Sequence, residues 1–269
     1  MRTVHYELLR PAEIIAARDL CPVIYVPIGP LEWHSLHMPL GTDGLNAAAV
    51  ALRVAERIGG VVLPPFFWGT ERERPPQMVE DLGFGAGEYI VGMDFPANSL
   101  PSLYCREEFL GLWLRELLDL LIRQQYKLIV LVNGHGARNH LDTLQRLAIE
   151  FSASSPARVL LTTAWPARGD PDTFTGHADA GETSVMMALF PDSVELGALP
   201  PDSEPLRSRD WAIVDPETFN GHPTPQHTLR PEYDPRLRSS ADKGRRILGL
   251  AAEDVGAVVR EALAALGLG

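Results

Sequence analysis

The stretch Glu32-Trp33-His34-Ser35-Leu36-His37-Met38-Pro39-Leu40-Gly41-Thr42-Asp43 brings two carboxylates and two imidazoles into one short segment. The apolar run 23–28 precedes it and predicts a buried strand. The alanine-rich pattern 46–58 follows it and predicts an amphipathic helix, closed by the glycine pair 59–60. The polar segment is therefore predicted to lie on the loop after a strand, where open α/β sheets bind their ligands.

Strands and helices alternate along the rest of the chain. This order predicts βαβ units and an α/β fold, a three-layer sandwich with a mainly parallel central sheet and helices on both faces. The sequence has no repeat and no linker-like change of composition, so a single domain over residues 1–269 is expected. Further strands are predicted at 61–63, 127–132 and 158–163, and further helices at 11–18, 106–126, 140–152, 181–190 and 239–266.

Two stretches lack a periodic pattern. Residues 66–104 combine glycine, proline and aromatic side chains, which is typical of a packed functional loop. A lid, an oligomer contact and a simple cover over the core all agree with that composition. Residues 191–235 are rich in proline, aspartate and serine and are expected to follow the surface.

The composition makes some partners improbable. The chain has 24 basic and 35 acidic residues, a net charge of −11 and no basic stripe, so no nucleic-acid partner is expected. No apolar run approaches the ~18 residues of a membrane span, and the N-terminal segment lacks the apolar core of a signal peptide. A cytoplasmic protein with no membrane partner is therefore predicted. Cys21 and Cys105 are expected to be buried thiols, since two cysteines make no disulfide framework.

A second polar cluster follows the most apolar of the predicted strands. His135 lies between Gly134 and Gly136, directly after residues 127–132. The glycines permit a tight turn and leave the imidazole uncovered. Taken alone, this histidine agrees equally with a metal ligand and with a structural role.

The third cluster is His177-Ala178-Asp179-Ala180-Gly181-Glu182. Asp179 is expected to cap the helix that follows it. Glu182 has a plain explanation as a carboxylate in the first helical turn, where the helix dipole favours it. Three clusters of histidines and acids, each after a predicted strand or at a helix start, are nevertheless expected to converge at one edge of the sheet. Imidazole and carboxylate are the usual ligands of zinc and manganese, so the sequence predicts a metal site there.

The order of these motifs carries a family resemblance. The motifs are Glu32-x-His34-x-x-His37-x-Pro39-Leu40-Gly41-Thr42-Asp43, Asn133-Gly134-His135-Gly136-x-x-Asn139, His177-Ala178-x-x-x-Glu182-Thr183-Ser184 and Asp234-Pro235-x-Leu237-x-x-x-Ala241-x-Lys243-Gly244-Arg245-Arg246. Together they resemble the creatininase (creatinine amidohydrolase) family over roughly residues 20–260. The resemblance implies a three-layer α/β fold, a two-metal site and a homohexamer built as a trimer of dimers.

The resemblance also implies individual roles. Asp43 is similar to the carboxylate that bridges the two ions, and His177 to the active-site histidine near the leaving group. Zinc is the expected metal, with manganese as the alternative at one of the two positions. The implied metal ligands are Glu32, His34, Asp43, His135 and Glu182.

The residue types agree with that chemistry. Two divalent ions that share a carboxylate acidify a bound water and supply a nucleophile at neutral pH. An imidazole such as His177 can then protonate the departing nitrogen. His37 is expected either to orient a ligand or to be a core imidazole bonded to the backbone. Trp68, Arg72, Arg74 and Trp165 are candidates for shaping the substrate pocket, and the remaining histidines are expected to be structural or on the surface: His5, His140, His222 and His227.

Several positions depart from the family pattern. Ser35 replaces a usual glycine. Ala137 lies where creatininase itself has an acidic ligand, and Ala180 lies where many members have a larger, often acidic residue. The segment 69–95 is longer than usual. These changes argue against creatinine as the substrate.

Three functions agree with these observations. The leading hypothesis is a metal-dependent hydrolase that cleaves a C–N amide bond of a small cyclic or formyl amide. The first alternative is ring-opening hydrolysis of a C–C bond in a cyclic keto-inositol type of substrate. The second alternative is a catalytically silent member that serves as an assembly or binding module. All five expected ligands are present, which disfavours this last hypothesis.

Overall fold

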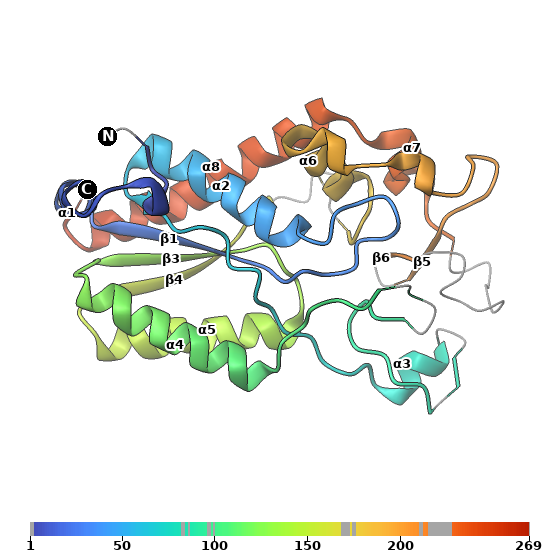
Figure 1. Ribbon diagram of the computed structural model, residues 1–269, viewed down its shortest axis with the longest axis horizontal. Coiled ribbons are helices and arrows are strands. Elements are labelled where there is room, and N and C mark those ends of the chain that lie inside the picture. The colour runs from blue at the N-terminus through green and yellow to red at the C-terminus, as the bar shows by residue number, and fades with distance from the viewer. Residues whose placement is uncertain are drawn as a thin grey trace.

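The central sheet lies between two layers of helices, as the sequence predicts (Figure 1). The computed structural model describes residues 3–81, 84–85, 87–95, 98, 100–167, 173, 176–209, 212–214 and 228–268. The sheet has the order β2-β1-β3-β4, and its pairings are all parallel. Its strands are β1 (Val23–Ile28), β2 (Val61–Val62), β3 (Leu128–Asn133) and β4 (Arg158–Thr163).

The two helical layers cover opposite faces of the sheet. One layer consists of α2 (Thr42–Ile58), α6 (Ala180–Leu189) and α8 (Ala241–Ala265) (Figure 1). The other consists of α4 (Glu107–Arg123) and α5 (Arg138–Ser154). The shorter elements are η1 (Tyr6–Leu8), α1 (Pro11–Leu20), α3 (Pro76–Asp81), η3 (Pro191–Ser193), η4 (Leu196–Ala198), η7 (Pro231–Tyr233), α7 (Pro235–Arg238) and the antiparallel pair β5 (Arg207–Arg209) and β6 (Ala212–Val214).

The pleat of β1 divides the apolar side chains between two cores. Val23 and Tyr25 belong to the core shared with α2, α6 and α8, whereas Ile24 and Val26 belong to the core shared with α4 and α5. Successive side chains of a strand point to opposite faces, so a strand covered on both sides needs apolar residues at every position. This is why β1 and β3 read as continuous apolar runs in the sequence.

A third and smaller core lies outside the sheet. It surrounds α3, a helix that the sequence did not predict within residues 66–104. The helix is too short to produce a recognisable apolar repeat, and only Pro76 at its start is a helix signal. Trp33, the residue between Glu32 and His34, belongs to this core; the other members are Val79, Phe84, Ile90, Met93 and Phe95.

The start of α2 corrects the predicted position of Asp43. The helix begins at Thr42 and not at residue 46, so Asp43 lies in its first turn and not on the preceding loop. Thr42, Asp43 and Gly44 are weak helix formers, which hid this turn in the sequence. An acidic side chain in a first turn is favoured by the helix dipole, which offsets the weak propensity.

Other predicted details are also changed. Cys21 and Cys105 are unpaired, as expected, but half-buried and not fully buried. Their partial burial raises the pKa of both thiols. The C-terminal segment forms one long helix, α8, capped by Ser240. His222 and His227 lie outside the described residues. Among the residues that are described, no helix combines the length and apolar character of a membrane crossing.

Candidate metal centre

The five predicted ligands come together at the carboxyl ends of β1 and β3. Glu32 and His34 lie on the loop after β1, and His135 follows β3. Asp43 and Glu182 lie in the first turns of α2 and α6. All five side chains are buried. Parallel strands end at a common edge of the sheet, which is why segments far apart in the sequence meet here.

Two glycines allow the first turn of α2 to approach the sheet. A Cβ atom on Gly134 would lie 2.1 Å from the carbonyl oxygen of Asp43. A Cβ atom on Gly29 would lie 2.5 Å from the Cβ of Asp43. Neither contact is sterically allowed, so both positions require glycine. The close approach places the Asp43 carboxylate between the ends of β1 and β3.

The first group of donors consists of Glu32, Asp43 and His135. His135 Nδ1 lies 3.1 Å from Asp43 Oδ2 and 3.3 Å from Glu32 Oε2. Burial works against the positive charge on His135, but the two carboxylates overcome it and raise the pKa of this histidine well above its usual value. The group therefore attracts a positive charge.

The second group consists of His34, Asp43 and Glu182. His34 Nε2 lies 3.6 Å from Asp43 Oδ1 and 3.5 Å from Glu182 Oε2. Asp43 thus belongs to both groups and presents a different oxygen to each histidine. This is the arrangement expected of a bridging carboxylate.

The hydrogen bonds of His34 test whether this donor set fits a cation. His34 Nδ1 lies 2.9 Å from the carbonyl oxygen of Glu32, so Nδ1 donates a proton to it. In the neutral ring Nε2 then carries a lone pair, and this buried atom has no hydrogen-bond partner among the described residues. A lone pair that faces two carboxylates is unfavourable unless a positive charge lies between them. The residues therefore fit a divalent cation.

The pKa values of the second group also indicate that positive charge stabilises it. Burial opposes protonation of His34, yet Glu182 and Asp43 outweigh it and raise the pKa of His34 to about 10. Burial raises the pKa of Glu182 to about 8, and the Asp43 charge adds to this shift. Without a metal the group holds protons that a divalent ion would displace, as metal sites of this kind generally do.

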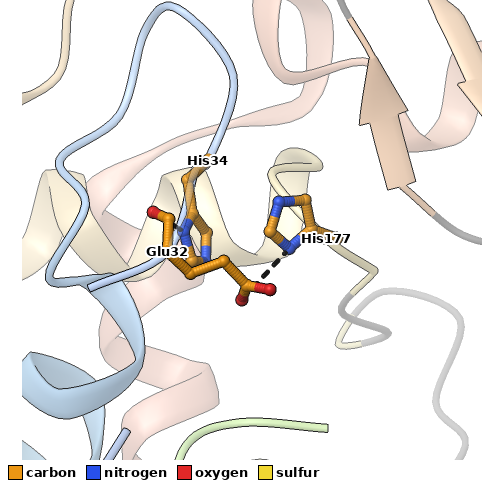
Figure 2. A group of neighbouring side chains, drawn as sticks. All are labelled: Glu32, His34 and His177. Atoms are coloured by element: carbon orange, nitrogen blue, oxygen red, sulfur yellow. Dashed lines mark hydrogen bonds and ion pairs between the residues drawn. The ribbon is translucent and has the colours of Figure 1, made fainter. Parts of the chain in front are cut away.

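His177 points into the same cluster from the segment before α6 (Figure 2). Its Nε2 lies 2.5 Å from the carbonyl oxygen of Trp33, so this nitrogen donates. Its Nδ1 therefore carries the lone pair and lies 3.8 Å from Glu32 Oε2. Glu32, His34 and His177 form a third group that can hold an ion, so the geometry permits His177 to act as a ligand as well as a proton carrier.

The start of α6 is held by two backbone features. Asp179 caps the helix, as predicted, and accepts hydrogen bonds from the N–H groups of Gly181 and Glu182. Ala178 has a φ of +54°, which is uncommon for a residue with a side chain. In this conformation the Ala178 N–H donates to Glu182 Oε2 at 2.6 Å. The turn between His177 and α6 thus aims the Glu182 carboxylate.

His37 contacts the neighbour of a predicted ligand. Its Nε2 lies 2.9 Å from Thr183 Oγ1, and Thr183 follows Glu182 in α6. Burial, followed by the nearby charges of His34 and His177, lowers the pKa of His37 to about 3, so its ring is neutral. This contact agrees with an orienting role, which stays a prediction.

Three of the four pocket candidates occupy different places. The Trp165 indole donates to the carbonyl oxygen of Gly134 at 2.7 Å, next to His135. The Trp68 ring packs edge-on against Phe109 of α4, with 5.1 Å between the centroids. Arg72 is largely exposed and lies 3.9 Å from Glu107 of α4. Trp165 therefore lies beside the cluster, whereas Trp68 and Arg72 each contact α4.

The sequence did not reveal Tyr104 and Ser102 as parts of the site, whereas Arg74 is the fourth of the predicted pocket candidates. Tyr104 donates to Glu32 Oε1, and Ser102 Oγ accepts from the Trp33 N–H. Arg74 donates to the carbonyl oxygen of Gly92 and lies over Phe95, so it supports the third core. These residues fall in the aperiodic stretch 66–104, where no local pattern indicates which side chains face the site.

Comparisons with known proteins agree with this geometry. The family model described as "Creatininase: Creatinine amidohydrolase" matches residues 7–259. The chain belongs to the creatininase family. It is therefore a hydrolase of the amidohydrolase type. The predicted resemblance is confirmed over nearly the whole chain.

Individual relatives of this creatininase-family chain span most of its length. Creatinine amidohydrolase of Pseudomonas putida is 28% identical over 267 residues, which cover 92% of this chain and 91% of that protein. A mycofactocin precursor peptide peptidase of Mycolicibacterium smegmatis is 29% identical over 184 residues, 65% of this chain and 61% of that protein. The crystal structure of a creatinine amidohydrolase superposes with a TM-score of 0.69 at 25% identity, covering 97% of this chain and 98% of the other.

Proposed function

We propose that this creatininase-family member is a binuclear metal-dependent hydrolase that cleaves a C–N amide bond of a small cyclic or formyl amide. The observation that carries the proposal is the position of His34 Nε2, which has no hydrogen-bond partner within the described part of the chain and faces the carboxylates of Asp43 and Glu182 at 3.6 and 3.5 Å. A buried arrangement of this kind is stable only with positive charge at its centre. The curated relatives, an amidohydrolase and a peptide peptidase, support an amide as the bond that is cleaved.

The ions would be held by the two donor groups that share Asp43. Their nitrogen and oxygen donors suit zinc, with manganese as the alternative. When bound, such ions polarise a carbonyl and lower the pKa of a water. The residues proposed to hold them are Glu32, Asp43 and His135 in one group, and His34, Asp43 and Glu182 in the other.

His177 is proposed to carry the proton. Its Nε2–H is fixed on the Trp33 carbonyl, which aims Nδ1 at the centre. In the metal-free chain burial, followed by the His34 charge, lowers the pKa of His177 to about 4, so its ring is neutral at neutral pH and Nδ1 has a lone pair for the proton. Glu32 Oε2, 3.8 Å away, stabilises the protonated ring until the proton passes to the leaving nitrogen.

Creatinine itself is proposed to be a poor substrate. Ala137 and Ala180 are both buried, and their methyl groups add no polar atom to the site. A substrate or metal ion that needs a carboxylate at position 137 or 180 therefore lacks that partner in this chain.

We further propose that the protein is cytoplasmic and forms a homohexamer, built as a trimer of dimers. Light scattering of the purified chain would test the hexamer.

The first experiment is metal analysis of protein purified without chelator, combined with a hydrolysis screen. We expect about two ions per chain, fewer in Glu182→Gln, and none in Asp43→Ala, which removes the shared carboxylate. Glu150→Gln is the control, because Glu150 pairs with Arg115 on the surface. One ion or none, unchanged in Glu182→Gln, would refute the binuclear site.

The substrate screen separates the competing functions. It contains formyl amides, cyclic amides, creatinine, short peptides and cyclic keto-inositol compounds. Cleavage of the amides alone supports the proposal, and cleavage of the ring ketone supports the C–C alternative. A chain that binds two ions and cleaves none of these substrates supports the silent assembly module.

A further inference from the structure

Tyr104 contacts a predicted ligand although it lies far from that ligand in the sequence. Its hydroxyl group lies 2.5 Å from Glu32 Oε1, across 72 positions of the chain. An ionised carboxylate can only accept, so the tyrosine hydroxyl donates. Tyr104 comes shortly before α4, in a segment without helix or strand.

This hydrogen bond assigns different partners to the two oxygens of Glu32. Oε1 receives the Tyr104 hydroxyl, whereas Oε2 lies 3.3 Å from His135 Nδ1 and 3.8 Å from His177 Nδ1. The terminal torsion of a glutamate is broad, so the plane of the carboxylate can otherwise rotate away from the histidines. The Tyr104 hydroxyl holds one oxygen and thereby keeps the plane in the orientation in which the other oxygen faces His135 and His177.

Tyr104 is itself held in place on both sides. The N–H of Met93 donates to its hydroxyl oxygen at 3.2 Å. The neighbouring residues of Tyr104 are bonded to the loop that carries Glu32: the Leu103 N–H donates to the Leu31 carbonyl at 2.8 Å, and the Trp33 N–H donates to Ser102 Oγ at 2.9 Å. The segment 102–104 is thus clamped on residues 31–33, which fixes the direction of the Tyr104 hydroxyl.

We propose that Tyr104 is a positioning residue for the metal group Glu32–Asp43–His135 and acts through Glu32. Its hydroxyl raises the metal affinity of this group by holding the carboxylate in the binding orientation. The group His34–Asp43–Glu182 does not use Glu32 and keeps its affinity when the hydroxyl is removed. The inference rests on the proposed function, because it assumes that both groups bind metal.

The test is a metal titration of the full-length metal-free chain with Zn²⁺ against a competing indicator. Tyr104→Phe keeps the ring and removes the hydroxyl. We expect one of the two ions to bind roughly 10–100-fold more weakly, the usual effect of losing a group that orients a ligand, and the other to bind as in the wild type.

Tyr25→Phe is the matched control. Tyr25 also donates its hydroxyl to the protein, to the Gly59 carbonyl at 3.3 Å, at the end of α2 opposite to Asp43. Both variants keep the ring and lose one hydroxyl group with the bond that it donates, and Tyr104→Phe also loses the bond from the Met93 N–H, so both test the general effect on folding. We expect the metal affinity of Tyr25→Phe to equal that of the wild type.

A second variant tests whether Tyr104 acts through Glu32. In a Glu32→Ala background the side chain that Tyr104 holds is already absent, so Tyr104→Phe is expected to add less than about a twofold change, which is the non-additivity of residues in contact. Additive losses in the double variant would overturn the inference.

The single variant can overturn the inference as well. It would do so if Tyr104→Phe weakened the binding of both ions equally, or weakened metal binding no more than Tyr25→Phe does. A wild-type chain that binds no Zn²⁺ would remove the proposed function and this inference together, and so is distinguishable from failure of the inference alone.

Discussion

The candidate metal centre has two walls of different construction. The strand-end wall consists of Asp43 and His135, which are fixed by the ends of β1 and β3 and the first turn of α2. The loop wall consists of residues 93–95, 98 and 100–104; in these described residues there is no helix or strand, and hydrogen bonds and the third core hold them. Backbone geometry thus determines the first wall, and individual side chains determine the second. We expect substitutions in the two walls to differ in kind as well as in size.

Gly134→Ala is expected to have the largest effect, because it breaks the strand-end wall. The added Cβ would lie 2.1 Å from the Asp43 carbonyl oxygen, a contact with backbone that no rotamer can relieve. We expect a loss of more than about 4 kcal/mol in the free energy of unfolding, or failure to fold. Thermal denaturation followed by circular dichroism measures this loss.

Gly136→Ala is the control for that change. No atom lies within 4 Å of a Cβ placed on Gly136, so its stability is expected to stay within about 0.5 kcal/mol of the wild type. If Gly134→Ala were as stable as Gly136→Ala, the close approach of α2 to β3 would not control this wall.

Two isoleucine truncations compare the cores that support the walls. Ile129 lies in the sheet and Ile90 in the third core, and both are fully buried. Each truncation to alanine costs about 2–5 kcal/mol. We expect Ile129→Ala to lower the global stability, and Ile90→Ala to increase hydrogen exchange in residues 93–104 with a smaller change in the unfolding temperature. Equal global losses would mean that both cores belong to one cooperative unit.

Asp179→Ala is expected to have an intermediate effect, confined to the start of α6. The Asp179 carboxylate accepts hydrogen bonds from the N–H groups of Gly176, Gly181 and Glu182. Loss of a helix N-cap costs about 1–2 kcal/mol. Calorimetric unfolding of the metal-free chain measures this change, and an unaltered unfolding temperature would contradict it.

Asp179→Asn keeps a capping side chain and changes the pH dependence. Burial raises the pKa of Asp179 to about 7, so the ionised form is disfavoured in the folded chain. Because the folded pKa lies above the unfolded value, the wild type loses stability as the pH rises from about 4 to above 7. We expect Asp179→Asn to be less destabilised than Asp179→Ala and to lack this loss. Parallel stability profiles of wild type and Asp179→Asn over that range would contradict the expectation.

Ala178→Gly is expected to have the smallest effect. Glycine relieves the strain of a φ of +54°, worth about 1–2 kcal/mol, but gains freedom in the unfolded chain, which costs about 0.5–1 kcal/mol. The net change in unfolding free energy is therefore a gain below about 1.5 kcal/mol. A clear loss of stability would show that the Ala178 methyl group, and not its backbone, supports the turn.

The sequence predicts the strand-end wall well for a physical reason. Strands buried on both faces must be apolar at every position, so β1 and β3 are visible as runs, and the polar residues directly after them mark the sheet edge. The motif around His135 then indicates its place at that edge. The position of Asp43 in the first turn of α2 was missed, because the turn consists of residues that rarely favour helix.

The loop wall has no such local signal. Tyr104 reaches Glu32 only because Ser102 and Leu103 are bonded to residues 31–33, a pairing across some 70 positions that no short-range pattern encodes. The helix α3 escaped prediction for a different reason, because its 6 residues are too few to show an apolar repeat. Trp68 and Arg72 contact Phe109 and Glu107 of α4, and their role in the substrate pocket stays a prediction.

The position of β1 and β3 within the sheet has a further consequence. Both strands are interior, with β2 and β4 as their outer neighbours, so neither strand that leads into the centre is an edge that can fray. We therefore expect the donors to remain assembled in the metal-free chain, where protons on His34 and Glu182 supply the positive charge, and the binding site to be preorganised. Reloading after chelation would then require no refolding, and the rate of metal uptake should rise in proportion to metal concentration without a slow conformational phase.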